Sequence, residues 1–185
     1  MANGQLGIGL VGSGMISEFQ AQAIGDLDNA VVTGFYDMVP ELAAKRAEQF
    51  GRKAYSNMEE LLADDGVDIV SICTPSGSHL EPSLAAAAAG KHVMVEKPVE
   101  VTTERIDQII SACNENGVTL GAIFPRRFFD TSRLLKAAVE EGRFGTLSLG
   151  DVAIKWFRDQ AYYDQGGWRG TWKLDGGGAL MNQGI

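Results

Sequence analysis

The sequence lacks any apolar run of the roughly 18 residues that a membrane-spanning helix needs. No basic region precedes its first apolar stretch, so no signal peptide is predicted. Basic residues are also scarce, because 16 lysines and arginines against 24 acidic residues give a formal net charge of −8. A nucleic-acid partner needs a basic protein face. These absences predict a cytoplasmic protein that binds neither membrane nor nucleic acid.

Cysteine is rare as well. Cys73 and Cys113 both lie within apolar runs, and we expect two buried, reduced thiols. No metal site is predicted. What is present is ordinary for a soluble globular protein, since 45% of the residues are apolar. A chain of 185 residues can form one full domain, or one domain and part of another.

Apolar runs of strand length alternate with helical patterns in the first two thirds of the chain. Apolar residues between the runs recur at helical spacing, and Pro40 occupies a first-turn position that proline prefers. This alternation predicts an α/β fold, a Rossmann doubly wound parallel sheet with helices on both faces. Ligands of such sheets bind beyond the carboxyl ends of the strands. The expected strands cover 6–11, 31–36, 68–73, 92–95 and 118–124.

A glycine-rich segment, GLVGSGMIS at 9–17, closes the first expected strand and opens a helix. Its second glycine allows a tight turn, its third leaves room for a pyrophosphate, and the helix offers unpaired N–H groups to the phosphates. Ser17 replaces the usual glycine or alanine of this fingerprint, a mild departure because serine is small. The residues expected to contact a dinucleotide here are Gly12, Ser13, Gly14, Met15 and Ile16.

Asp37 ends the second expected strand, 25 residues after Gly12. A carboxylate there can accept hydrogen bonds from both ribose hydroxyls of an adenosine and would repel a 2′-phosphate. No arginine follows it directly, so the sequence favours NAD over NADP. Asp37 could instead be a simple turn residue, and a methyltransferase would also fit a glycine loop with an acid.

Lys97 argues against a methyltransferase. The stretch HVMVEKPVE at 92–100 is an apolar strand that ends on a glutamate, a lysine and a proline. Hydride transfer to or from an alcohol needs a group that exchanges a proton, and a free lysine with a pKa near 10.4 is a poor base at neutral pH because it is protonated. Partial burial beside a positively charged nicotinamide would lower that pKa, and Glu96 could tune or hold the side chain. Glu96 and Lys97 are both expected to contact the cofactor. The alternative is a surface Lys-Pro turn.

Five motifs stand out along the chain: GLVGSGMIS at 9–17, CTPSGSH at 73–79, EKP at 96–98, PRRF at 125–128 and GGWRGTWKLDGGGALMNQGI at 166–185. Together they resemble the glucose–fructose oxidoreductase/inositol dehydrogenase/MocA (Gfo/Idh/MocA) family. The resemblance implies that Thr74 and Pro75 line the dinucleotide, that His79 lies near the nicotinamide, and that Lys97 is the catalytic lysine before a cis Pro98. It also implies oxidation or reduction of a hydroxyl carbon on a sugar, a cyclitol or a nucleotide-linked sugar. His79 could instead cap a helix.

The pattern changes near 123–125, where we place a boundary between a NAD-binding domain (1–124) and the incomplete start of a substrate and oligomerisation domain (125–185). A helix is expected over 128–141. Residues 146–158 alternate apolar and polar, like the first strand of a half-exposed antiparallel sheet, so the second domain is expected to be α+β. A lone strand leaves its edges unpaired, and we expect the complete sheet to hold a homo-oligomer together.

Aromatic and basic residues are dense in the second part. Rings can stack on the C–H face of a sugar and cations can bind carboxylates or phosphates, but the same composition suits an interdomain core or an oligomer surface. Lys155 is preferred as a contact because it lies on the opposite strand face from Trp156. Arg126 is expected to reach the cofactor, although it or Arg127 could pair with a scaffold carboxylate. The expected substrate contacts are Lys97, Lys155, Arg158, Trp168, Arg169 and Asn182.

The last four residues depart from the family's D-x-G-x-H pattern. Asn182 replaces the acid, and the position of the histidine falls after Ile185. We therefore expect the N-terminal piece of a two-domain enzyme. Two functions stay open: a NAD-dependent dehydrogenase of which this chain carries the cofactor half, and a dinucleotide-binding module without turnover that acts as a sensor or scaffold. Lys97 and the arginine–aromatic segment favour the first.

Overall fold

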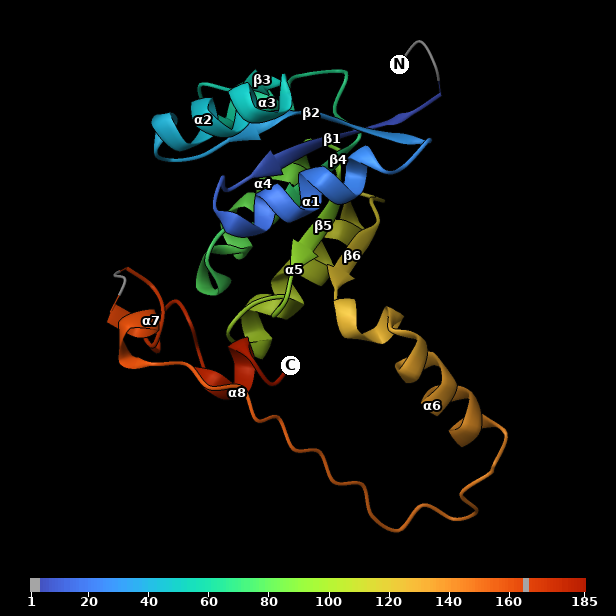
Figure 1. The fold of residues 1–185 in the computed structure, drawn as a ribbon. Coiled ribbons are helices and arrows are strands. Elements are labelled where there is room, and N and C mark those ends of the chain that lie inside the picture. Colours follow the sequence, from blue (N-terminus) through green and yellow to red (C-terminus); the bar gives the residue numbers. More distant parts are fainter. Residues whose placement is uncertain (1–3, 165–166) are drawn as a thin grey trace.

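A six-stranded parallel sheet forms the centre of the computed structural model, which describes residues 4–164 and 167–185 (Figure 1). The strand order is β3-β2-β1-β4-β5-β6, and every pairing is parallel. The predicted Rossmann fold is therefore confirmed. The order reverses between β1 and β4, which opens a crevice at their carboxyl ends. The strands are β1 Leu6–Val11, β2 Ala30–Tyr36, β3 Lys53–Ala54, β4 Ile69–Ile72, β5 His92–Glu96 and β6 Leu120–Ile123.

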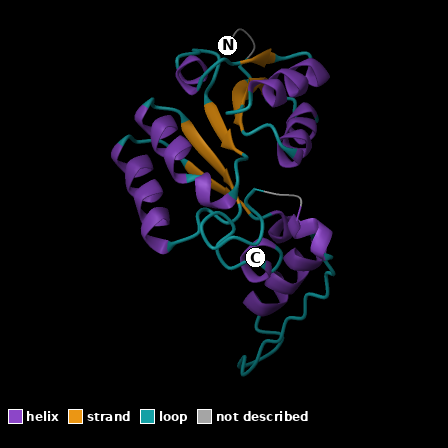
Figure 2. Cartoon of the chain, turned by 90° about the vertical axis from the view of Figure 1, so that its left-hand side faces the viewer, coloured by secondary structure: helices purple, strands orange, loops and turns teal. Residues whose placement is uncertain are grey.

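Helices cover both faces of this sheet (Figure 2). Successive strand residues point to opposite faces, so Leu10 joins the core beneath α1 and α2, whereas Val11 joins the core beneath α4 and α5. The two cores are built from strands that are apolar on both sides, which is the pattern that the sequence predicts. The helices are α1 Met15–Gly25, α2 Pro40–Phe50, α3 Met58–Leu62, α4 Leu80–Ala88 and α5 Thr103–Glu115, with a 3-10 turn η1 at Ser76–Ser78.

The second part of the chain differs from the expectation. Residues 146–158 form no strand, and Leu149 and Phe157 are 86% and 85% exposed. The described residues provide no neighbouring strand for this segment, and a strand without a ladder partner is not stable in water. Figure 1 shows it leaving α6 and returning to α7 and α8 as irregular chain. The remaining elements are a 3-10 turn η2 Pro125–Phe128, α6 Asp130–Glu140, α7 Gln160–Asp164 and α8 Ala179–Asn182.

The chain as described offers no candidate for a membrane span, since none of its helices combines the necessary length with sufficient apolar character.

Candidate functional site

A cavity of about 950 Å³ lies beyond the carboxyl ends of β1, β4 and β5. The glycine loop, the end of β2 and the start of η1 form one part of its wall. The end of β5, the turn at 124–127 and residues of the C-terminal segments 152–162 and 168–185 form the other parts. The C-terminal segment is joined to η1, because the Gly77 N–H donates to the Leu174 carbonyl at 2.8 Å. A cavity of this size suits a dinucleotide or a similarly large ligand.

In the glycine loop, Gly12 packs so closely against the backbone after β4 that no side chain fits at this position. This residue has φ +91°, and an added Cβ would lie 2.8 Å from the Cys73 carbonyl carbon. Gly14 has an ordinary φ of −73° and precedes the first residue of α1. Nothing lies within 4 Å of the place where its Cβ would be, so the space there is open to a ligand. Ser17 is fully buried, and its hydroxyl donates to the Gly14 carbonyl at 2.7 Å, a contact that glycine or alanine could not make.

Asp37 joins the end of β2 to this loop. Its Oδ2 accepts the Ser13 N–H at 2.6 Å, and its Oδ1 accepts the Val39 N–H at 2.9 Å. Asp37 lines the cavity beside the exposed Met38. Each carboxylate oxygen keeps further acceptor capacity, so the side chain can hold the loop and still accept from a ligand hydroxyl.

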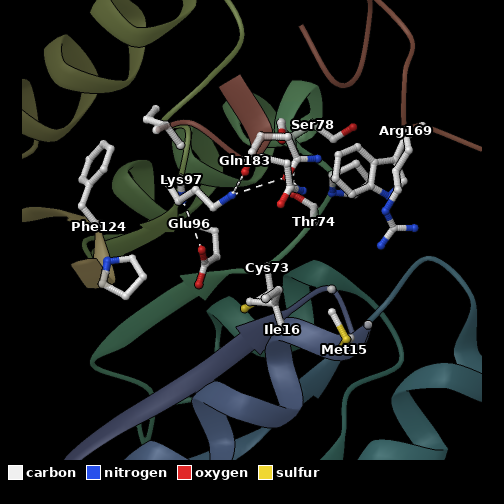
Figure 3. Close-up of a pocket in the computed structure, with 18 of the residues that line it drawn as sticks. Met15, Ile16, Cys73, Thr74, Ser78, Glu96, Lys97, Phe124, Arg169 and Gln183 are labelled. Carbon is white, nitrogen blue, oxygen red and sulfur yellow. Dashed lines mark hydrogen bonds between the residues drawn. The ribbon is translucent and has the colours of Figure 1, made fainter. Parts of the chain in front are cut away.

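Lys97 follows β5 and enters the cavity half-buried (Figure 3). Its Nζ donates to the backbone carbonyl of Asn182 and lies 3.4 Å from the Asn182 Oδ1. Burial lowers the pKa of Lys97, and the nearby Glu96 carboxylate opposes this shift. The peptide bond to Pro98 is cis, as the family resemblance implies. Lys97 therefore loses its proton at a lower pH than a free lysine does.

Glu96 does not bind the Lys97 ammonium directly. Its Oε1 accepts the Gln20 amide at 2.7 Å, and the Gln20 Oε1 in turn accepts the Ser71 hydroxyl. This chain of polar contacts fixes the carboxylate under the cavity. Sequence reasoning missed Gln20, because no local signal connects a helix residue to a strand end 76 positions later.

His79, which the resemblance places near the nicotinamide, is buried behind the cavity wall. Its side chain is 1% exposed and is not part of the cavity wall. Its Nε2 is 2.9 Å from the Thr74 carbonyl, and its Nδ1 is 2.9 Å from the Pro98 carbonyl. Nor does the side chain cap α4. His79 instead connects the loop after β4 to the turn after β5, behind the lysine.

The two cysteines are free thiols, as predicted. Cys113 is buried, whereas Cys73 is half-buried and lines the cavity. Burial raises the pKa of both thiols, so neither is an activated nucleophile. No cluster of metal-ligating side chains occurs within 4–164 or 167–185.

The remaining predicted residues divide into two groups. The cavity is lined by Thr74, Pro75, Arg126, Arg158, Trp168, Arg169 and Asn182, together with Gly12, Gly14, Met15 and Ile16 of the glycine loop. Ser13 is buried beneath the loop and does not line the cavity. Lys155 is exposed and does not line it either. Alternation explains the difference, because the even-numbered residues Val152, Ile154 and Trp156 face the cavity and place Lys155 on the other side. Gly166, the first residue of the last family motif, lies outside the described residues.

Asp175 is a buried carboxylate that sequence reasoning also missed. It is 1% exposed and accepts the Asn182 side-chain amide at 2.9 Å and the Gly170 N–H at 2.7 Å. The orientation of Asn182 against Lys97 therefore depends on Asp175. Gln183 donates to the Tyr162 hydroxyl at 3.2 Å and completes this side of the cavity.

Comparison with known proteins places this site in context. Residues 6–124 match a family model described as "Oxidoreductase family, NAD-binding Rossmann fold", and residues 132–185 match the "GFO/IDH/MocA C-terminal domain". Myo-inositol 2-dehydrogenase of Thermotoga maritima is 34% identical over 75% of this chain and 42% of its own length. The scyllo-inositol 2-dehydrogenase (NADP(+)) IolW of Bacillus subtilis is 29% identical over 90% of this chain and 44% of its own.

A solved structure matches more of the chain. The WlbA dehydrogenase from Bordetella pertussis, crystallised with NADH and UDP-GlcNAcA, superposes with a TM-score of 0.93 at 37% identity. The match covers 98% of this chain and 53% of the WlbA chain. The present chain thus spans about half the length of the relatives that it matches.

Proposed function

Because the chain belongs to the Gfo/Idh/MocA family of oxidoreductases, we propose that it is the cofactor-binding part of a NAD-dependent dehydrogenase. The reaction is hydride transfer between nicotinamide and a hydroxyl carbon of a sugar-like substrate. The observation that carries this proposal is the position of the Lys97 ammonium, which enters the cavity formed by the glycine loop and the C-terminal segment.

The residues present fit a dinucleotide. The cradle at Gly12 excludes any side chain, and the space beside Gly14 is open, as a pyrophosphate requires. The start of α1 offers N–H groups to phosphate oxygens, and Asp37 can accept from ribose hydroxyls. Thr74 and Pro75 line the next part of the wall. When bound, the nicotinamide supplies the hydride chemistry.

Lys97 supplies the proton chemistry in this proposal. In the oxidation direction its neutral amine takes the proton of the substrate hydroxyl, and in the reduction direction its ammonium returns it. Desolvation lowers its pKa, which favours access to the neutral amine. Asn182 orients the amine through two oxygens, and Asp175 fixes Asn182.

A nucleotide-linked sugar is the substrate class that we favour. WlbA, which matches nearly the whole chain, was crystallised with such a compound. Arg158, Trp168 and Arg169 provide rings and cations on the same wall of the cavity, as a sugar with acidic substituents needs. Turnover of a nucleotide-linked sugar in the full-length enzyme, followed as NADH absorbance, tests this assignment. A protein that binds NADH but converts no sugar or cyclitol would support the alternative, a binding module without turnover.

The proposal includes a preference for NAD over NADP. Among the matched proteins, IolW is named as NADP(+)-dependent, whereas WlbA was crystallised with NADH. We expect the chain to bind NADH more tightly than NADPH, since the Asp37 carboxylate would face a 2′-phosphate of like charge. Titrating both cofactors against protein fluorescence measures the difference. Asp37→Ala should reduce the difference in affinity between NADH and NADPH. Asp107 lies on α5 outside the cavity wall, so Asp107→Ala should leave this difference unchanged. Equal or tighter NADPH binding by the unmodified chain would contradict the role of Asp37.

A further inference from the structure

The cavity carries a charge opposite to that of the protein. The whole chain has a formal net charge of −8. The cavity wall, in contrast, contains five cationic side chains and two carboxylates. Cationic side chains that line a cavity create a positive electrostatic potential inside it, even when the protein as a whole is acidic. Such a cavity attracts anionic ligands. The cations are Lys97, Arg126, Arg127, Arg158 and Arg169, and the carboxylates are Asp37 and Glu96.

Three of these arginines are stacked on aromatic rings. The guanidinium carbon of Arg126 is 4.2 Å from the ring centroid of Trp156. That of Arg158 is 5.5 Å from the same centroid and 5.3 Å from the centroid of Tyr162. That of Arg169 lies 4.9 Å from Tyr162 and 5.0 Å from Trp168. Stacking holds the planar groups in place and leaves their N–H edges available to oxygen atoms.

These N–H edges are largely unused. Throughout 4–164 and 167–185, no carboxylate forms an ion pair with any of the three guanidinium groups. Arg158 donates to the Phe157 carbonyl at 2.9 Å and to the Gln183 side chain at 3.1 Å. The Arg169 Nε is buried and has no hydrogen-bond partner there. Buried donors normally have partners, and a ligand oxygen in the cavity would supply one to Arg169.

We propose that Arg126, Arg158 and Arg169 form an anion-binding wall for the acidic groups of the substrate, phosphate or carboxylate oxygens. This inference rests on the function proposed above and specifies its substrate as anionic. The phosphates of the cofactor already have a place at the glycine loop and the start of α1. Figure 3 shows Arg169 well apart from Lys97, so a substrate whose hydroxyl meets the lysine extends toward the arginines. A sugar joined to a diphosphate has this form.

Binding measurements on the full-length protein test the proposal. UDP, UDP-glucose and UDP-glucuronate are titrated by calorimetry, and NADH is titrated separately. Arg158→Gln and Arg169→Gln should each weaken UDP-glucuronate binding by roughly 10- to 100-fold, the usual effect of losing a hydrogen bond to a charged group. Arg133→Gln is the matched control, because this arginine also lies over a ring, Phe128 at 6.0 Å, but outside the cavity wall.

The probes separate the sources of the anion. If the arginine variants also bind UDP and UDP-glucose more weakly, the arginines bind the diphosphate. If they bind only UDP-glucuronate more weakly, the arginines bind the sugar carboxylate. Unchanged affinity for all three compounds would overturn the proposal. So would a loss of NADH affinity equal to the loss for UDP-glucuronate, since the arginines would then hold the cofactor. Both of these outcomes would overturn the anion-binding wall only. The proposed dehydrogenase function would still be supported if the unmodified protein binds NADH.

Discussion

The Lys97 ammonium is subject to opposing influences on its pKa. Desolvation lowers the pKa, while the negative charges of Glu96 and Asp175 raise it, and the net shift is downward. The Glu96 carboxylate is occupied by Gln20, so it opposes the shift without closing an ion pair with the ammonium. A lysine in this environment can exchange protons at a lower pH than a free one.

We predict that alcohol oxidation by the full-length enzyme becomes faster as pH rises, with a midpoint below the ordinary lysine value of 10.5. Below the midpoint Lys97 is an ammonium and cannot accept a proton, whereas above it the neutral amine can. Lys97→Met should reduce turnover by roughly a hundred- to ten-thousand-fold and remove this limb of the profile. The measurement is kcat/KM as a function of pH.

Two controls separate chemistry from folding in this experiment. Lys45→Met, on the exposed side of α2, should retain the turnover and the pH profile. NADH affinity should be nearly unchanged in the Lys97 variant. If Lys97→Met kept normal turnover, or lost NADH affinity in proportion to activity, the lysine would have a structural role only.

Among the elements, the glycine loop contains two glycines that are needed for different reasons. Gly12→Ala should destabilise the fold by about 1–3 kcal/mol, because it strains a left-handed φ and creates a backbone clash. Gly14→Ala should change the free energy of unfolding by less than about 0.5 kcal/mol, because φ is ordinary and the space is open. It should nevertheless weaken NADH binding, since the methyl group occupies the pyrophosphate approach.

Urea unfolding and NADH titration of the same two variants test this division. The prediction fails if both variants lose the same stability, or if Gly14→Ala binds NADH as tightly as the unmodified chain.

His79 connects two loops at the end of the sheet. His79→Ala removes the ring nitrogens that contact the Pro98 and Thr74 carbonyls, one of which accepts from a neutral imidazole, and leaves a void, so we expect the free energy of unfolding to fall by roughly 2–4 kcal/mol. His92 is the matched control, since it is exposed at the start of β5 and accepts one N–H, from Thr119 at 3.0 Å. His92→Ala should cost less than about 1 kcal/mol. Similar losses in urea unfolding for both variants would show that the contacts of His79 contribute little.

The two parts of the molecule differ in how well they bury apolar side chains. The sheet and its helices enclose two continuous cores. In contrast, α6 presents Leu134 and Leu135 at 71% and 59% exposure, and Trp172 is 86% exposed. Exposed apolar side chains favour association with another surface.

We predict that the 185-residue chain self-associates through these residues. Light scattering should give an average mass that rises with protein concentration, and Leu134→Glu together with Leu135→Glu should reduce the rise. The same two substitutions should leave NADH affinity unchanged, because neither residue lines the cavity. A clean monomer at high concentration would contradict this prediction.

Local patterns in the sequence determine the parallel sheet, the glycine loop and the place of Lys97. Alternation of apolar runs with helical spacing defines βαβ units, and these units bring the strand ends together whatever follows in the chain. Gly12 and Lys97 could be identified for the same reason, since Gly12 directly follows one expected strand and Lys97 lies two residues after the end of another. The expected strand at 146–158 was wrong because alternation alone does not provide a partner strand.

Only the tertiary structure decides which distant residues meet. Lys97 and Asn182 are 85 positions apart, and their contact depends on the docking of Leu174 against Gly77. His79 has the spacing of a cofactor residue, yet two backbone carbonyls hold it behind the cavity. The wall of stacked arginines likewise appears only when residues from η2 and from 156–169 converge. Side-chain direction and long-range docking are set by packing in three dimensions, which a one-dimensional pattern does not contain.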